Sequence, residues 1–151
     1  MIKRATLKIV RCEHAEGIKA PVQAKPGDAG YDLRSTIDVT LWPGDQVTIP
    51  LGFRWQLPTG WCGIIIPKSG LGRKYRAGLA NTVGLLDEDY TGEVMADVVD
   101  DGNNPDDPWI ISRGDSVCQM IILPYWSGAP EEVADLAETV RGAGGFGHTG
   151  R

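Results

Sequence analysis

Glycine and proline interrupt this chain at short intervals, which leaves little room for long regular elements. The 151 residues include 20 glycines and 10 prolines, about one residue in five. Proline removes a backbone hydrogen-bond donor, and glycine destabilises the interior of helices and strands. The sequence therefore argues against a helical bundle and predicts many short strands joined by tight turns.

The segments between these turns have the residue pattern of β-strands. Apolar and polar side chains alternate in several of them, and the run from Trp61 to Ile66 is apolar enough for a buried strand. Strands of this length and spacing predict one all-β domain, either a sandwich or a barrel. We expect them at 6–10, 37–41, 46–50, 53–57, 61–66, 94–99, 109–112 and 116–123.

Two segments could instead be helical. Residues 69–79 follow Pro67 and carry three basic side chains, which suits a short helix or a turn. Residues 131–138 (EEVADLAE) are good helix formers. Their apolar positions fill only one short turn, however, and tertiary context can override propensity in so short a segment. We therefore expect at most one short helix.

The charge and the apolar runs exclude several classes of protein. The net charge of −5 disfavours binding to duplex DNA or RNA, which needs a basic face. A few local Arg and Lys residues can still bind a small polyanion at short range. No apolar run approaches the roughly 20 residues of a membrane-spanning helix. We expect a protein that binds neither duplex nucleic acid nor membranes.

The N-terminus and the cysteines indicate a reducing compartment. Residues 1–4 begin no hydrophobic secretory signal. Cys12, Cys62 and Cys118 lie far apart without a CxxC pair, so a zinc site is not indicated. We expect all three to be reduced and to pack as small buried hydrophobic residues. The expected location is the cytoplasm, or the host cytoplasm if the protein is viral.

The C-terminal residues differ from the rest of the chain. Residues 141–150 contain five glycines together with Arg141, Phe146, His148 and Thr149. Glycine-rich backbone can wrap closely around a ligand and offer N–H groups to phosphate oxygens, while arginine binds phosphate through its planar fork. We expect a β domain at 1–140 and a flexible arm at 141–151 that closes over a nucleotide. The alternative is a disordered tail.

Five polar, glycine-containing blocks occur within this β-rich chain. In their order and spacing they resemble the five motifs of the trimeric dUTPase family (deoxyuridine triphosphate nucleotidohydrolases), of the bacterial type. The resemblance covers most of the chain, from about residue 28 to residue 150. The blocks are 28–33 (DAGYDL), 67–70 (PKSG), 84–93 (GLLDEDYTGE), 113–119 (RGDSVCQ) and the C-terminal arm.

This resemblance implies a fold, an assembly and a reaction. The fold would be a distorted jelly-roll barrel or sandwich. The assembly would be a homotrimer whose three sites lie between subunits, each closed by the arm of a third chain. The enzyme would be a dUTP diphosphatase, which hydrolyses dUTP to dUMP and diphosphate. Its cellular role would be to limit uracil incorporation into DNA and to supply dUMP for dTMP synthesis.

The resemblance also implies roles for the polar residues of the blocks. Asp87 matches the carboxylate that activates the attacking water. Mg2+ would bridge the phosphates, held by Asp32 through bound waters, with Asp28 supporting that loop. The residues that match phosphate contacts are Lys68, Ser69, Gly70, Gln119 and, in the arm, Arg141 at the γ-phosphate with Gly147, His148 and Thr149.

Selection of uracil and deoxyribose is implied for a second group of residues. A β-hairpin at 79–86 would imitate a base partner, with Asn81, Gly84 and Leu86 lining the uracil. Tyr90 would pack under the deoxyribose and exclude a 2′-hydroxyl. Phe146 would stack on the uracil when the arm closes.

The chain departs from the usual family pattern at three places. Lys68 stands where arginine is common. Lysine lacks the planar guanidinium group, so it cannot hold a neighbouring carboxylate through two parallel hydrogen bonds as arginine can. In the fourth motif a cation precedes Gly114 (Arg113), and Ser116 stands where an arginine often follows the aspartate. The segment 100–108 is long and acidic, and we expect it to form an exposed loop.

Two other functions are compatible with parts of the sequence. One is a dCTP deaminase, or a bifunctional deaminase and diphosphatase, on the same fold; ammonia release from dCTP would identify it. The other is a non-enzymatic β module that only binds nucleotide, which would bind dUTP without forming dUMP. Asp87 and the arm favour the diphosphatase over both.

Overall fold

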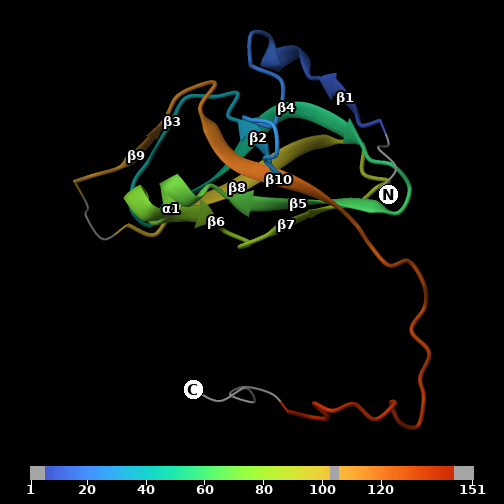
Figure 1. Ribbon diagram of the computed structural model, residues 1–151. Helices are drawn as coiled ribbons and strands as arrows, with labels where there is room; N and C mark the ends of the chain where they lie inside the picture. Colours follow the sequence, from blue (N-terminus) through green and yellow to red (C-terminus); the bar gives the residue numbers. More distant parts are fainter. Residues whose placement is uncertain (1–5, 103–105, 145–151) are drawn as a thin grey trace.

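The computed structural model describes residues 6–102 and 106–144 (Figure 1). Most of the regular structure in these residues is β-strand. The elements in chain order are β1 (Lys8–Arg11), the 3-10 helix η1 (Glu13–Ala15), β2 (Tyr31–Arg34), β3 (Val39–Leu41), β4 (Gln46–Gln56), β5 (Trp61–Pro67), α1 (Ser69–Tyr75), β6 (Ala77–Leu79), β7 (Gly84–Leu86), β8 (Glu93–Asp100), β9 (Trp109–Ile111) and β10 (Ser116–Pro124).

The strands form two four-stranded sheets and a two-stranded ribbon. One sheet has the order β1-β4-β8-β6 and the other has the order β2-β10-β5-β7, while β3 pairs with β9. All of these ladders are antiparallel. The all-β prediction is confirmed in the form of a sandwich, because the strands in the described part of the chain leave both large sheets open (Figure 1).

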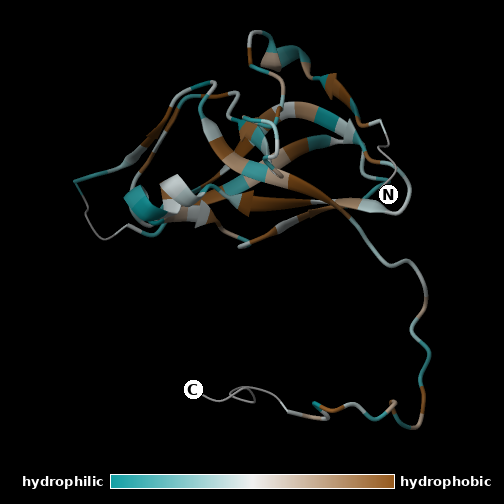
Figure 2. Ribbon diagram, in the orientation of Figure 1, coloured by the Kyte–Doolittle hydropathy of each residue, from teal (hydrophilic) through white to brown (hydrophobic). Residues whose placement is uncertain are grey.

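A single apolar core lies between the two large sheets. On β8, Val94, Ala96 and Val98 alternate with more exposed residues and point inward. Leu33 on β2 and Met120 on β10 are buried from the opposite sheet. Complete burial of a large aliphatic side chain stabilises a fold by about 1.5–3 kcal/mol. Figure 2 shows these strands as alternating hydrophobic and hydrophilic segments, whereas α1 is mostly hydrophilic.

Strand β4 combines two segments that the sequence predicts as separate strands. Its ladder with β8 shifts register between Pro50 and Arg54. Gly52 lies in this irregularity with a φ of 77°, a left-handed conformation that favours glycine. A Cβ at Gly52 would lie 2.4 Å from the Cβ of Ala15 and 2.7 Å from Cγ2 of Thr36. The bulge therefore bends one continuous strand and lets η1 pack against it.

The structure contains one of the two helices considered from the sequence. Helix α1 ends at Tyr75, and Arg76 caps it in the left-handed conformation with a φ of 55°. The segment 131–138 is not helical and lies on an exposed tail that leaves the body after β10 (Figure 1). Without an apolar surface to pack against, its propensity does not suffice. Among the described residues, no helix is long and apolar enough to cross a membrane.

The three cysteines are free thiols in different surroundings. Cys118 is fully buried on β10, whereas Cys12 and Cys62 are half-buried. The expectation of three buried hydrophobic cysteines is therefore correct for Cys118 and wrong for the other two. Burial raises the pKa of the Cys118 thiol to about 12, with Asp32 adding to the shift.

Candidate active site

Three predicted phosphate and metal residues lie side by side across strands β2, β10 and β5 of the second sheet. Asp32 on β2 and Gln119 on β10 are partners across the ladder, and Gln119 is also the partner of Ile66 on β5. Lys68 follows β5 directly. These side chains line a cavity of about 460 Å3, together with Ala24, Asp28, Ala29, Gly30, Ile66 and Ile121. We call this the phosphate-side cavity.

Lys68 braces the carboxylate of Asp32. Its Nζ lies 3.2 Å from Oδ2 of Asp32, and a guanidinium nitrogen of Arg34 lies 4.0 Å from the same oxygen. Both cations are partly exposed, so solvent screens the attraction, and the pair serves geometry more than stability. Lysine at this position therefore still contacts the neighbouring carboxylate, through one ammonium in place of a planar fork.

Gly30 leaves space for the amide of Gln119. A Cβ at position 30 would lie 2.7 Å from Oε1 of Gln119. A side chain at position 30 would require the Gln119 amide to shift, so Gly30 leaves room for the amide as it lies in the cavity wall. Ser69 and Gly70 lie beside this cavity in sequence, in the exposed first turn of α1.

The predicted uracil and sugar residues line a second cavity of about 260 Å3. Its wall includes Asn81, Gly84, Leu86, Asp87 and Tyr90, so the structure brings this group together as expected. We call this the base-side cavity. Its remaining lining residues are Ile65, Leu85, Val94 and Met95.

The connection between β6 and β7 differs from the predicted hairpin. β6 pairs with β8 in one sheet and β7 pairs with β5 in the other, so the chain crosses between sheets at residues 80–83. Thr82 makes this turn with a φ of 65°, and its N–H donates to the carbonyl of Leu79 over 2.9 Å. The two strands separate because each completes a different ladder. This opening lies beside the base-side cavity.

Asp87 is exposed at the end of β7 and borders a third cavity of about 470 Å3. Glu88 and Tyr125 line that cavity, and the carboxylate of Glu88 accepts a hydrogen bond from the Gly60 N–H. The N–H of Tyr125 donates to the carbonyl of Gly60 over 3.0 Å. A hydrogen bond to Glu88 raises the pKa of Tyr125, and partial desolvation and the nearby carboxylates add to this shift.

The described residues fit a hydrated magnesium ion better than a directly bound one. They contain no group of three or more His, Cys, Asp or Glu side chains able to enclose a metal. Two carboxylates, Asp28 and Asp32, line the phosphate-side cavity, and Lys68 donates to one oxygen of Asp32. One or two carboxylates suit Mg2+, which keeps much of its water shell and is often bound together with substrate phosphates.

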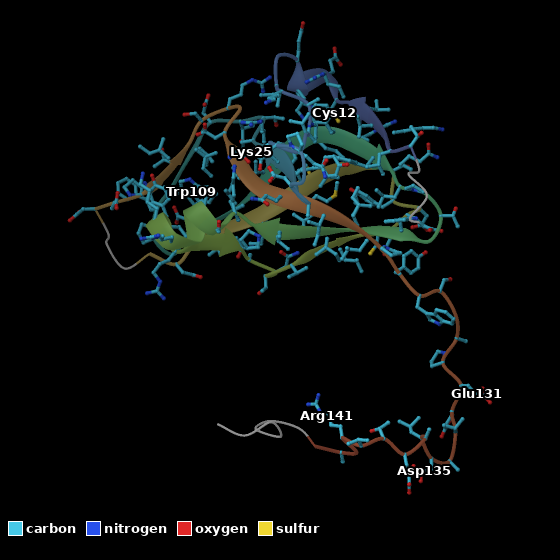
Figure 3. All side chains as sticks on the ribbon, viewed as in Figure 1. Cys12, Lys25, Trp109, Glu131, Asp135 and Arg141 are labelled. Atoms are coloured by element: carbon cyan, nitrogen blue, oxygen red, sulfur yellow. The ribbon has the colours of Figure 1, made fainter. Side chains whose placement is uncertain are left out.

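The tail carries Arg141 away from both cavities of its own chain. In Figure 3, Glu131, Asp135 and Arg141 lie on the extended segment, separated from the body. The Nε of Arg141 donates to the carbonyl of Gly144 over 2.8 Å, a contact within the tail. Phe146, Gly147, His148 and Thr149 lie outside the described residues.

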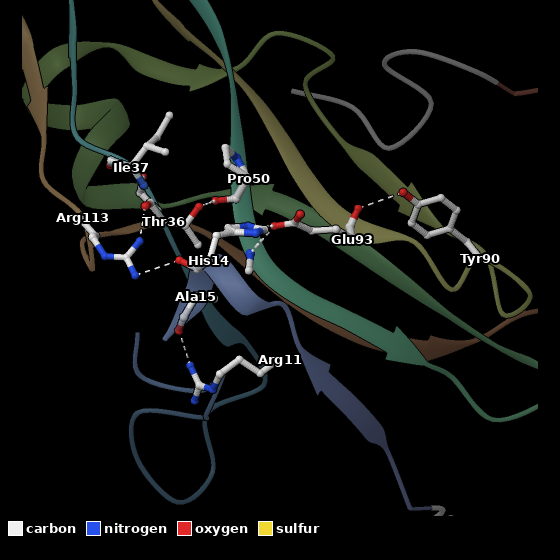
Figure 4. A network of polar contacts seen from close by, with 11 residues as sticks. Arg11, His14, Ala15, Thr36, Ile37, Pro50, Tyr90, Glu93 and Arg113 are labelled. Carbon is white, nitrogen blue, oxygen red and sulfur yellow. Dashed lines mark hydrogen bonds and ion pairs between the residues drawn. The ribbon is translucent and has the colours of Figure 1, made fainter. Parts of the chain in front are cut away.

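The sequence did not reveal how the residues near the site are fixed to the N-terminal segment. Arg113 donates from one guanidinium nitrogen to the carbonyl of Thr36 and from the other to the carbonyls of His14 and Glu16 (Figure 4). The cation that precedes Gly114 thus ties residues 14–16 to the body. The unusual position of Arg113 in the fourth motif indicates a special role. Its partners could not be predicted, because they lie about 80–100 residues away in sequence.

Glu93 forms a second link to this segment. Its Oε1 accepts from the Gly52 N–H over 2.7 Å and lies 2.9 Å from Nε2 of His14. Its backbone carbonyl accepts from the Tyr90 hydroxyl over 2.9 Å. Glu93 therefore connects the bulge of β4, the N-terminal segment and the aromatic ring of the base-side cavity.

Comparison with solved structures shows the shared fold. The dUTPase of Staphylococcus bacteriophage 80alpha superposes with a TM-score of 0.82 at 21% identity, covering 97% of this chain and 99% of the phage chain. The dUTPase from phage phi11 of S. aureus gives a TM-score of 0.77 at 22% identity, covering 89% and 100%. At this identity the likeness establishes the fold alone, a jelly-roll β-sandwich.

Sequence comparison gives the family. A dUTPase family model matches residues 16–150. Deoxyuridine 5'-triphosphate nucleotidohydrolase from Rhizobium etli is 38% identical over 149 residues, which cover 96% of this chain and 94% of that protein. The protein of the same name from Desulfitobacterium hafniense is 40% identical over 147 residues, covering 95% of each. The chain therefore belongs to the dUTPase family.

Proposed function

We propose that this protein is a dUTP diphosphatase, which hydrolyses dUTP to dUMP and diphosphate. The observation that carries the proposal is the exposed Asp87 carboxylate at the rim of a cavity lined by Asn81, Gly84 and Tyr90, in a chain of the dUTPase family. The relatives from Rhizobium etli and Desulfitobacterium hafniense bear the name of this activity. The phage 80alpha enzyme has a solved structure with dUPNHPP.

Asp87 orients the attacking water and accepts its proton. The water oxygen attacks the α-phosphorus, the bond from that phosphorus to the oxygen bridging to the β-phosphorus breaks, and diphosphate leaves. A carboxylate is a weak base, but it accepts the proton as the new phosphorus–oxygen bond forms. The exposure of Asp87 supports this role, because the water must reach it from solvent.

The base-side cavity selects the nucleoside. The polar groups of Asn81 and the backbone at Gly84 and Leu86 bind uracil, and the confined wall rejects the thymine methyl group. Tyr90 packs under the deoxyribose. The small volume of this cavity, about 260 Å3, supports a fit to a single pyrimidine nucleoside.

The phosphate-side cavity holds the triphosphate. Lys68, Ser69, Gly70 and Gln119 contact phosphate oxygens, and fixed donors of this kind stabilise the charge that develops during transfer. Asp32 would hold Mg2+ through bound water, and the ion would neutralise part of the phosphate charge. A solved mutant dUTPase from phage phi11 coordinates a structural Mg(II) ion, which supports magnesium as a metal that this fold can bind.

Three copies of the chain complete three sites. The arm position supports this assembly, since Arg141 lies on a tail that extends away from both cavities of its own chain. Arg141 would clamp the γ-phosphate of a site on other copies, and Phe146, Gly147, His148 and Thr149 would close it. A single small domain thus builds a deep site between subunits.

The cellular role follows from the reaction. Hydrolysis of dUTP keeps uracil out of newly made DNA, and the dUMP formed supplies dTMP synthesis. The free cysteines support a reducing compartment such as the cytoplasm.

Product analysis tests this function directly. Purified protein with dUTP and Mg2+ should release dUMP and diphosphate in equal amounts, and addition of a chelator should slow the reaction. Binding of dUTP without product would contradict the enzyme and favour a nucleotide-binding module. Ammonia release from dCTP would indicate a deaminase instead.

A further inference from the structure

The ring of Tyr90 lies directly over the backbone of Gly92. A Cβ at position 92 would lie 2.6 Å from the hydroxyl oxygen of Tyr90, 2.7 Å from Cζ and 3.1 Å from Cε2. The first two distances are shorter than real Cβ contacts, so any side chain at position 92 would displace the ring. Gly92 is not one of the described glycines that have a positive φ, so its backbone conformation does not itself require glycine. What the position requires is the absence of a side chain beneath the ring.

Tyr90 is also held at both ends by hydrogen bonds. Its N–H donates to the carbonyl of Asp87 over 3.2 Å, and its hydroxyl donates to the carbonyl of Glu93 over 2.9 Å. The side chain is nevertheless 46% exposed, so packing in the core does not fix the ring. These backbone contacts and the space above Gly92 determine where the ring lies.

Glu93 is in turn a fixed point of the fold. Figure 4 shows its carboxylate directed toward His14 and the β4 backbone, with its carbonyl bonded to Tyr90. Oε1 accepts from the buried Gly52 N–H over 2.7 Å and lies 2.9 Å from Nε2 of His14. The carbonyl that accepts the hydrogen bond of the Tyr90 hydroxyl therefore belongs to a residue whose carboxylate is held by Gly52 and His14.

We propose that Gly92 and Glu93 are positioning residues for the Tyr90 ring and thereby set the preference for deoxyribose over ribose. The inference rests on the proposed function, in which Tyr90 packs under the sugar. Ribose differs from deoxyribose by one hydroxyl group. Rejection of one added hydroxyl depends on close fit, and a ring that moves by a few tenths of an ångström no longer provides it.

The Gly92→Ala variant tests the inference through substrate preference. We expect the ratio of kcat/KM for dUTP to kcat/KM for UTP to fall about tenfold, mainly through a lower KM for UTP, because the displaced ring no longer excludes the 2′-hydroxyl. Gly78→Ala is the matched control, because Gly78 is similarly half-buried and a Cβ there would make an ordinary 3.9 Å contact with Cγ of Pro67. Its ratio should equal that of the wild type.

A double-mutant cycle with Tyr90→Ala separates positioning from general damage. If Gly92 acts through the ring, Gly92→Ala leaves the ratio unchanged once Tyr90 is alanine. An additional change in that background would overturn the inference, as would an unchanged ratio in Gly92→Ala alone. A wild-type protein that fails to hydrolyse dUTP would refute the proposed function itself.

Tyr90→Phe keeps the test decisive if Gly92→Ala does not fold. This change removes the bond to the Glu93 carbonyl and leaves the ring and the space above Gly92 intact. We expect a smaller fall in the ratio, about fivefold, since one neutral hydrogen bond contributes about 1 kcal/mol. A ratio equal to that of the wild type would exclude the role of Glu93.

Discussion

Asp87 owes its exposure to the last residues of β7. Leu86 before it is buried in the core, and strand alternation directs the next side chain outward. The turn that follows is closed by the Tyr90 N–H, which donates to the Asp87 carbonyl. The same backbone therefore positions both the carboxylate that we propose activates the water and the ring that we propose packs under the sugar.

Replacement of Asp87 by asparagine should separate chemistry from binding. The amide keeps the size of the carboxylate but cannot accept the proton of the water, so we expect kcat to fall about 10²–10⁴-fold. Binding of dUTP, measured by calorimetry with a non-hydrolysable analogue, should stay near the wild-type value. Normal turnover by Asp87→Asn would show that another group activates the water.

Cys118 should be chemically silent in the native protein. Burial raises its pKa to about 12, so almost no thiolate forms at about pH 8. We expect iodoacetamide to alkylate Cys62 and Cys12 long before Cys118, and all three at comparable rates in urea, as measured by peptide mass. Equal labelling of Cys118 and Cys62 in the native state would contradict the buried placement.

At the residue scale, short motifs carried most of the information about the site. Asp32, Lys68 and Gln119 surround one cavity and Asn81, Asp87 and Tyr90 another, as the motifs indicate. The supporting contacts were not predictable. His14 and Glu93 are 79 residues apart, and only the folded chain shows that they meet.

At the element scale, alternation located most strands and failed where a strand bends. β4 looks like two strands because Pro50 and Gly52 interrupt its pattern, yet the chain continues through a bulge. β2 was hidden within a polar motif at Tyr31–Arg34. Residues 131–138 form no helix, in agreement with the expectation of at most one short helix, because that segment has no apolar surface to cover.

The contact between Tyr125, which follows β10, and Glu88 predicts a pH-dependent stability. The bond to Glu88 raises the pKa of Tyr125 above its ordinary value of 10.0. Below that value both folded and unfolded chains keep the proton and the stabilisation is complete; it is lost as pH rises through the higher folded-state pKa. The gap in unfolding free energy between wild type and Tyr125→Phe should therefore shrink from about pH 8 to about pH 11 in urea titrations. A constant gap would contradict the bond.

Removal of residues 141–151 should abolish activity without unfolding the protein. The described tail from Tyr125 to Ala143 is exposed throughout and contributes no residue to the core. We expect an unchanged Tm and a loss of turnover of about 10²-fold or more, because the arm supplies fixed phosphate donors. Full activity in the truncated protein would refute closure by the arm.

At the scale of the whole molecule, one chain contains two separate cavities, and the described part of its own C-terminal tail covers neither of them. The base-side and phosphate-side cavities have no lining residue in common, and the tail that carries Arg141 leads away from both. The proposed homotrimer would resolve this arrangement, since each site could then combine surfaces of different copies. The negative net charge is compatible with the proposed function, because a local cation such as Lys68, which lines the phosphate-side cavity, can attract a polyanion at short range.

Diphosphate release from a panel of dUTP, dCTP, dTTP and UTP tests the central claim most directly. The proposed base and sugar contacts predict rapid release from dUTP, with kcat/KM for each of the other three at least about 10²-fold lower. Comparable release from dCTP or dTTP, or none from dUTP, would contradict the account.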